Sequence, residues 1–114
     1  MEIKTSEYSV WEDLQTNTVF FEGTMRLSGT PAYDEISRLL EARLAATTGT
    51  LTLDLSGLEL MNSSGINLLA KFTIRVRTSK LGGFVIRGSK DYPWQSKSLY
   101  NLSRLYPALV LEVK

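Results

Sequence analysis

Two neighbouring hydroxyl groups, those of Ser63 and Ser64, lie in the stretch NSSG at positions 62–65, between a leucine-rich segment and an apolar helical pattern. A serine oxygen at such a place can cap the helix by accepting a hydrogen bond from a first-turn N–H, which stabilises it by about 1 kcal/mol. The same oxygen can accept a phosphoryl group, which adds about −1.5 to −2 charges at neutral pH. Three residues after these serines come Ile66 and Asn67, so neither serine starts a capping box. The sequence leaves both roles open, and one serine can fill both.

The composition removes most other kinds of site chemistry. The 114 residues include no cysteine and no histidine, which excludes disulfides, thiolate chemistry and zinc sites with the usual ligands. The phosphate-binding motif G-x-x-x-x-G-K-[ST] and the dinucleotide-binding motif G-x-G-x-x-G are both absent from the sequence. No recognisable motif pairs a nucleophile with a lysine or carboxylate base. We therefore expect a protein that is not an enzyme and that has no cofactor and no bound metal.

The charge balance gives no case for nucleic acid or membrane partners. The formal net charge is +1, so there is no excess of positive charge to attract a phosphate backbone. No apolar run approaches the roughly 18 residues of a membrane helix, and the N-terminal residues lack the apolar centre of a signal peptide. We expect a cytoplasmic protein, with one domain over residues 1–114.

Hydrophobic periodicity predicts an α/β fold. Alternating apolar residues on both sides of positions 15–18 predict an N-terminal β-hairpin with Asn17 near its tip, and Gly23 predicts a bulge. Thr30 and Pro31 are expected to cap and start the first helix. The remaining expected elements are strands at 50–55, 84–87 and 109–113, a helix from Ser63 or Ser64 to the Gly82-Gly83 turn, and a helix after Pro93. Ser56-Gly57 is expected to close the strand at 50–55. The order β-β-α-β-α-β-α-β requires a largely parallel or mixed sheet.

A cluster of aromatic residues, Tyr92-Pro93-Trp94, precedes the third helix. Exposed tryptophan and tyrosine can form the centre of a protein interface. Such residues more often pack a loop against the body of the domain, and this is the role that we expect here.

The segment from Asp54 to Gly65, taken with its neighbouring elements, resembles the STAS domain. It is most similar to the anti-sigma-factor antagonists of bacterial partner-switching systems. In that family a strand ends in Asp-Leu-Ser, a short loop follows, and Asp-Ser-Ser-Gly opens a helix; here the corresponding stretches are DLSG at 54–57 and NSSG at 62–65. The resemblance covers residues 18–113. It implies a single STAS-like domain with a small mixed β-sheet, an N-terminal β-hairpin and helices packed against the sheet.

The resemblance also implies a function. In these antagonists the first serine of Ser-Ser-Gly is the phosphoacceptor, which by position is Ser63. The implied partners are an anti-sigma factor that is itself a GHKL-type serine kinase and a PP2C-type phosphatase, and the unphosphorylated form captures the anti-sigma factor. The partner-binding surface implied by position comprises Asn62, Ser63, Ser64, Gly65, Arg26 and Ser28.

Two residues depart from the family pattern. Asn62 stands where the family commonly has aspartate, and Arg26 stands near a position that is often acidic, so the charge beside Ser63 differs. The alternative function is a constitutive interaction scaffold or ligand-sensing STAS module without phosphorylation, in which Ser63 only caps the helix. A homodimer is compatible with the sequence.

Overall fold

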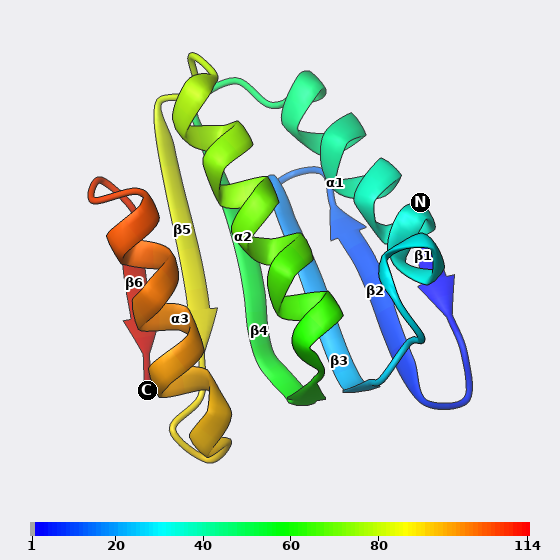
Figure 1. Cartoon of the computed structure of the whole chain (residues 1–114). Coiled ribbons are helices and arrows are strands. Elements are labelled where there is room, and N and C mark those ends of the chain that lie inside the picture. The colour runs from blue at the N-terminus through cyan, green and yellow to red at the C-terminus, as the bar shows by residue number, and fades with distance from the viewer. Residues whose placement is uncertain (1) are drawn as a thin grey trace.

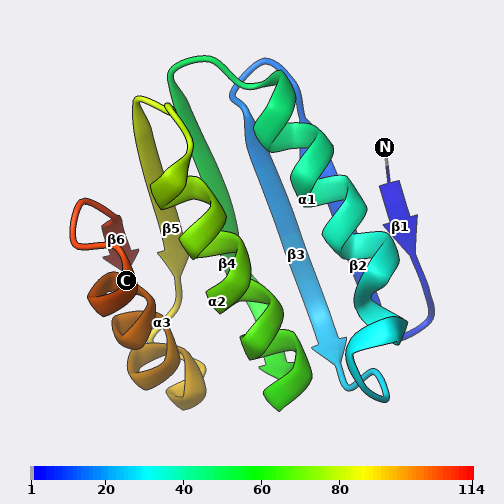
Figure 2. The ribbon, with the colours of Figure 1, turned by 45° about the horizontal axis from the view of Figure 1, so that its top comes forward.

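The computed structural model describes residues 2–114, which form a six-stranded mixed sheet with helices on one face. The strands lie side by side in chain order, and β1, β2 and β3 are antiparallel whereas β3, β4, β5 and β6 are parallel. The strands are β1 (Glu2–Lys4), β2 (Tyr8–Asp13), β3 (Thr18–Met25), β4 (Thr50–Met61), β5 (Gly83–Gly88) and β6 (Val110–Val113). The helices are the 3₁₀ turn η1 (Thr30–Tyr33), α1 (Asp34–Ala46), α2 (Ser63–Thr78) and α3 (Pro93–Leu105). In Figures 1 and 2, α1 covers the side of β1 to β3, α2 the middle of the sheet, and α3 the side of β5 and β6.

The core lies between the helices and the facing side of the sheet. Leu53 and Leu55 of β4 are fully buried beneath the helices, as is Leu69 of α2, and burial of each leucine side chain stabilises the fold by about 1.5–3 kcal/mol. Phe72 of α2 meets Phe84 of β5 edge to face, with ring centroids 6.0 Å apart. Strand alternation in β3 to β5 and the helical spacing in α1 and α2 therefore supply one continuous apolar layer.

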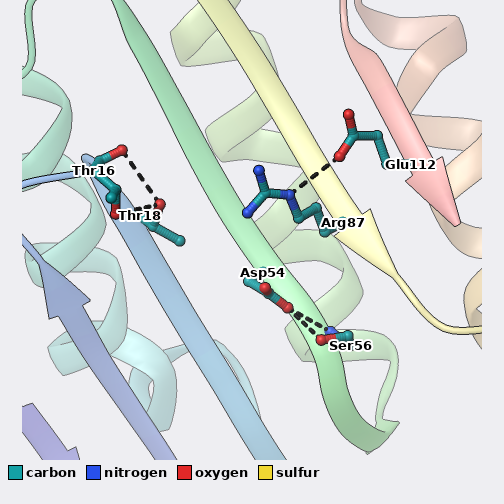
Figure 3. A network of polar contacts seen from close by, with 6 residues as sticks. All are labelled: Thr16, Thr18, Asp54, Ser56, Arg87 and Glu112. Atoms are coloured by element: carbon teal, nitrogen blue, oxygen red, sulfur yellow. Dashed lines mark hydrogen bonds and ion pairs between the residues drawn. The ribbon is translucent and has the colours of Figure 1, made fainter. Parts of the chain in front are cut away.

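The other face of the sheet is uncovered and carries polar side chains (Figure 3). The Arg87 Nε donates to Glu112 Oε1 at 3.1 Å, across the β5–β6 pair. Asp54 Oδ1 accepts from the backbone N–H and the hydroxyl of Ser56, at 3.0 and 2.5 Å. These contacts explain the polar residues that alternate with leucine along β4.

The expected hairpin, bulge and order of elements are confirmed, with one strand added. β1 was not expected; it pairs with β2 so that Ile3 lies opposite Val10. Gly23 has a φ of 97°, and the β3–β4 register shifts beside it. A Cβ at Gly23 would lie 2.3 Å from the Glu7 carbonyl oxygen, so the bulge requires glycine. The expected helix start, with Thr30 as cap and Pro31 as first residue, is wrong: Gly29 is the N-cap residue of the 3₁₀ turn η1, which includes Thr30 and Pro31, and α1 begins only at Asp34.

The expected end of β4 at Ser56-Gly57 is wrong, because the strand continues to Met61. β3 runs alongside it from Thr52 to Met61, and the parallel pairing places Glu22 opposite Gly57 and Met25 opposite Met61. The strand therefore passes directly into α2 with only Asn62 between them.

Candidate functional site

Asn62 is the residue that caps α2. Its backbone is extended, and its side-chain Oδ1 accepts a hydrogen bond from the Gly65 N–H at 3.1 Å. The Asn62 carbonyl oxygen accepts from the Ile66 N–H at 3.0 Å. The capping role that the sequence left open for Ser63 or Ser64 is therefore filled by Asn62. Asparagine and serine cap helices about equally well, so the local sequence could not choose between them.

The Asn62 side chain also joins three segments of the chain. Its Nδ2 donates to the Leu27 carbonyl oxygen at 2.8 Å, and its Oδ1 accepts from the Tyr33 hydroxyl at 2.7 Å. Its backbone N–H donates to the Met25 carbonyl oxygen at 3.0 Å. An aspartate could not donate to Leu27 at neutral pH, because an ionised carboxylate only accepts hydrogen bonds. The asparagine that departs from the family pattern thus has a defined structural role here.

These bonds bring the loop after β3 against the start of α2. Arg26 and Ser28 lie on that loop and are exposed, as is Ser63. The structure therefore brings together the six residues expected at the site on one end of the molecule, with Leu27 as the link.

Gly65 is required by close packing inside the first turn of α2. A Cβ at this position would lie 2.5 Å from Met61 Cγ and 2.8 Å from the Tyr33 hydroxyl oxygen. Gly65 itself is buried. The glycine of the NSSG stretch thus lets Met61 and Tyr33 approach the helix backbone.

Ser63 and Ser64 occupy the first two positions of α2 and differ in exposure. Ser63 is exposed, whereas Ser64 is half-buried and lines a small groove between α1 and α2, with a volume of about 90 Å³. Within residues 2–114 neither hydroxyl makes a hydrogen bond, and the backbone N–H groups of both serines have no acceptor. The first N–H groups of a helix have no intrahelical partner and lie at its positive end. The Ser63 oxygen is therefore free, accessible and next to unpaired donors.

Tyr33 is the site residue that the sequence did not reveal. Its spacing predicts only a core position, and its ring is indeed buried. Burial raises the pKa of the Tyr33 hydroxyl above its ordinary value of 10.0, so the hydroxyl stays protonated and donates to Asn62 at neutral pH. No local pattern indicates this bond, because it spans 29 positions of the sequence.

The described residues contain no cluster of acidic side chains suited to a metal ion. None of the helices in this part of the chain is long and apolar enough to cross a membrane.

Comparison with solved structures identifies the fold. SiaC of Pseudomonas aeruginosa superposes with a TM-score of 0.75 and 15% identity, over 100% of this chain and 96% of SiaC. A chain in the crystal structure of the P. aeruginosa diguanylate cyclase SiaD in complex with its activator SiaC gives 0.72 and 15%, over 100% of this chain and 99% of that one. An anti-sigma factor antagonist from Mycobacterium paratuberculosis gives 0.67 and 20%, over 91% of this chain and 86% of the antagonist.

These matches confirm the expected STAS-like fold, a small mixed sheet with an N-terminal hairpin and helices on one face. No protein-family model matches the sequence. No curated protein matches it either.

Proposed function

We propose that the chain is a cytoplasmic partner-switching regulator of the anti-sigma-factor-antagonist kind, whose unmodified form binds a regulatory protein and releases it when Ser63 is phosphorylated. One observation carries the proposal: Ser63 is exposed at the first position of α2 while Asn62 performs the capping. The fold shared with an anti-sigma factor antagonist supports it.

The division of roles between Asn62 and Ser63 suits a switch. A phosphate on the Ser63 oxygen removes no hydrogen bond of the folded domain, because that oxygen makes none within residues 2–114. The phosphate would lie at the positive end of α2, whose first turn holds no acidic residue. Phosphorylation should therefore leave the domain folded.

The same phosphate should weaken a complex formed over the site. A partner that fits a neutral hydroxyl would have to desolvate a group carrying about −1.5 to −2 charges. A cost of about 3 kcal/mol corresponds to roughly a hundredfold loss of affinity. The expected contact surface is the exposed Ser63, Arg26 and Ser28 with the half-buried Asn62 and Ser64, whereas Gly65, which the sequence also placed on this surface, is buried and shapes the turn.

The proposed partners are an anti-sigma factor that is also a GHKL-type serine kinase and a PP2C-type phosphatase that restores the hydroxyl. A second partner class is favoured by the full-length match to SiaC, which activates the diguanylate cyclase SiaD. In that case the unmodified chain would bind and activate a cyclase. Binding measurements with purified proteins of both classes separate the two.

The proposal is tested by incubating the chain with a cognate kinase and ATP and locating added phosphate by peptide mass spectrometry. Phosphate should appear on Ser63, and Ser63→Ala should abolish it whereas Ser64→Ala should not. Affinity for the partner should be retained in Ser63→Ala and fall in Ser63→Asp. A partner that binds all these forms equally, with no phosphate on Ser63, would instead identify a constitutive scaffold.

A further inference from the structure

The second half of β4 lacks a strand neighbour on one side. β5 pairs with β4 only from Thr50 to Asp54, whereas β3 pairs with it as far as Met61. Residues 55–61 thus have a sheet partner on the β3 side and none on the β5 side. α3 begins near the end of the sheet where β4 passes into α2 (Figure 1).

Two side chains from the first turn of α3 bond to the backbone of residues 55–61, which β5 does not reach. Gln95 Nε2 donates to the carbonyl oxygens of Leu55 and Leu58, at 2.7 and 2.9 Å. Trp94 Nε1 donates to the carbonyl oxygen of Glu59 at 2.9 Å. Side chains of α3 therefore supply the donors that another strand would supply in a longer sheet.

Gln95 uses both ends of its side-chain amide to hold the β4 backbone and the residue after β5. It is completely buried, and its Oε1 accepts from the Ser89 N–H at 2.7 Å. The orientation of its amide is fixed, because two carbonyl groups require its nitrogen and one N–H requires its oxygen. Loss of the amide would leave buried backbone groups without partners, which is costly in a low-dielectric interior.

The strand segment held in this way leads directly to the site. Leu60 and Met61 follow it, opposite Thr24 and Met25 of β3, and Asn62 comes next. This short segment, residues 55–61, is therefore held on both edges. Side chains of α3 bond to its carbonyl groups on one edge, and the backbone of β3 pairs with it on the other. Its position sets where Asn62 meets Leu27, and therefore where Ser63 is presented.

We propose that Trp94 and Gln95 are positioning residues for Ser63, which hold the end of β4 so that the start of α2 is presented in one orientation. The role in phosphorylation rests on the function proposed above, whereas the role in fixing the strand end does not. Freed of these two side chains, the strand end would sample several positions. A kinase would then bind only the fraction of molecules with the correct geometry, and its apparent affinity would fall by that fraction.

Hydrogen exchange tests the structural part without a partner. The variants are Trp94→Phe, which keeps an aromatic ring and loses one donor, and Gln95→Met, which loses the amide. The control is Thr73→Val, because the buried Thr73 hydroxyl also donates to a backbone carbonyl, that of Leu69 at 2.8 Å. Trp94→Phe keeps the test decisive if Gln95→Met does not fold.

We expect exchange at the Asn62 and Gly65 N–H groups to become about tenfold faster in Trp94→Phe, relative to the Ile86 N–H in the centre of the sheet. Thr73→Val should leave this ratio unchanged. Equal ratios in Trp94→Phe, Thr73→Val and the unmodified sequence would overturn the proposal.

Kinase kinetics test the functional part. Trp94→Phe should raise the KM for the chain by about threefold with little change in kcat, while Thr73→Val changes neither. If hydrogen exchange at Asn62 and Gly65 is faster in Trp94→Phe but the KM is unchanged, the proposed role of Trp94 in phosphorylation is overturned. If the unmodified chain accepts no phosphate, the proposed function fails, and the exchange ratios alone then decide whether α3 positions the strand end.

Discussion

The hydroxyl of Tyr33 donates a hydrogen bond to Asn62 Oδ1 at 2.7 Å, which joins the turn before α1 to the residue that caps α2. The same oxygen accepts from the Gly65 N–H, and the amide nitrogen of Asn62 donates to Leu27. One side chain thus ties together the loop after β3, the turn before α1 and the helix that begins with Ser63.

Replacement of Tyr33 by phenylalanine leaves the ring and removes the hydroxyl, which donates to Asn62 Oδ1 at 2.7 Å and, more weakly, to the Met25 carbonyl oxygen at 3.3 Å. We expect the free energy of unfolding in urea to fall by about 1 kcal/mol, the usual net value of a buried hydrogen bond. Tyr100→Phe is the matched control, because Tyr100 is 61% exposed and its hydroxyl makes no hydrogen bond within the described residues. Equal unfolding midpoints for the two variants would contradict a role for the Tyr33 hydroxyl.

Asn62→Asp should destabilise the domain even though aspartate is a good helix cap. The carboxylate keeps the bond to the Gly65 N–H but faces the Leu27 carbonyl oxygen, with no hydrogen to donate. We expect a loss of about 1–2 kcal/mol at pH 7, measured by urea unfolding. Asn67→Asp, at an exposed position of the same helix, should change stability by less than about 0.5 kcal/mol. A stabilised Asn62→Asp variant would show that the bond to Leu27 contributes nothing.

Gly65→Ala should cost about 1–3 kcal/mol, although alanine is the better helix former by about 1 kcal/mol. The added methyl group would collide with Met61 and the Tyr33 hydroxyl. At Gly57 a Cβ would meet its nearest atoms at an ordinary 3.6 Å, so Gly57→Ala is the control. Thermal unfolding of both variants is the measurement, and similar melting temperatures would argue against tight packing at Gly65.

Ser63→Ala should leave the free energy of unfolding within about 0.5 kcal/mol of the original value, because Asn62 caps the helix. Asn62→Ala should lose about 1 kcal/mol for the cap alone, and more for its bonds to Tyr33 and Leu27. Urea unfolding of the two variants compares them directly. A marked loss of stability in Ser63→Ala would show that the Ser63 hydroxyl also caps the helix.

Alkaline pH should destabilise the domain through two tyrosines. Burial raises the pKa of Tyr33 and of Tyr8, and for Tyr8 the nearby Glu35 and Glu7 raise it further. Because the folded state holds these protons more tightly than the unfolded state, the stability that they contribute is present below pH 10 and is lost as the pH rises through the folded pKa values. Tyr33→Phe should show a shallower loss of stability above pH 10 than the unmodified chain. Parallel curves for the two would contradict the raised pKa of Tyr33.

The amino-acid sequence alone predicted the hairpin, the three helices, the order of elements and a start of α2 at Ser63 or Ser64. These features depend on local patterns: alternation with a period of two, helical spacing, and glycine or proline at the ends of elements. The exposure of Ser63 agrees with the family resemblance, and Leu27, which lies between Arg26 and Ser28, contacts Asn62. The added strand β1 is short, and Ile3 is its single buried residue, so it lacks the alternation of buried and exposed residues that would have predicted it.

The way in which the site is held depends on contacts between segments that are far apart in the sequence. Asparagine and serine are nearly equivalent caps. Asn62 is the cap because its side chain also forms hydrogen bonds with Leu27 and Tyr33, which lie 35 and 29 positions away in the sequence. In the same way, β4 continues past Gly57 because β3 accompanies it on one edge and Gln95, 40 positions from Leu55, bonds to its carbonyl groups on the other. Such long-range hydrogen bonds form only after the chain has packed, so a local pattern could predict where Ser63 lies but not what holds it there.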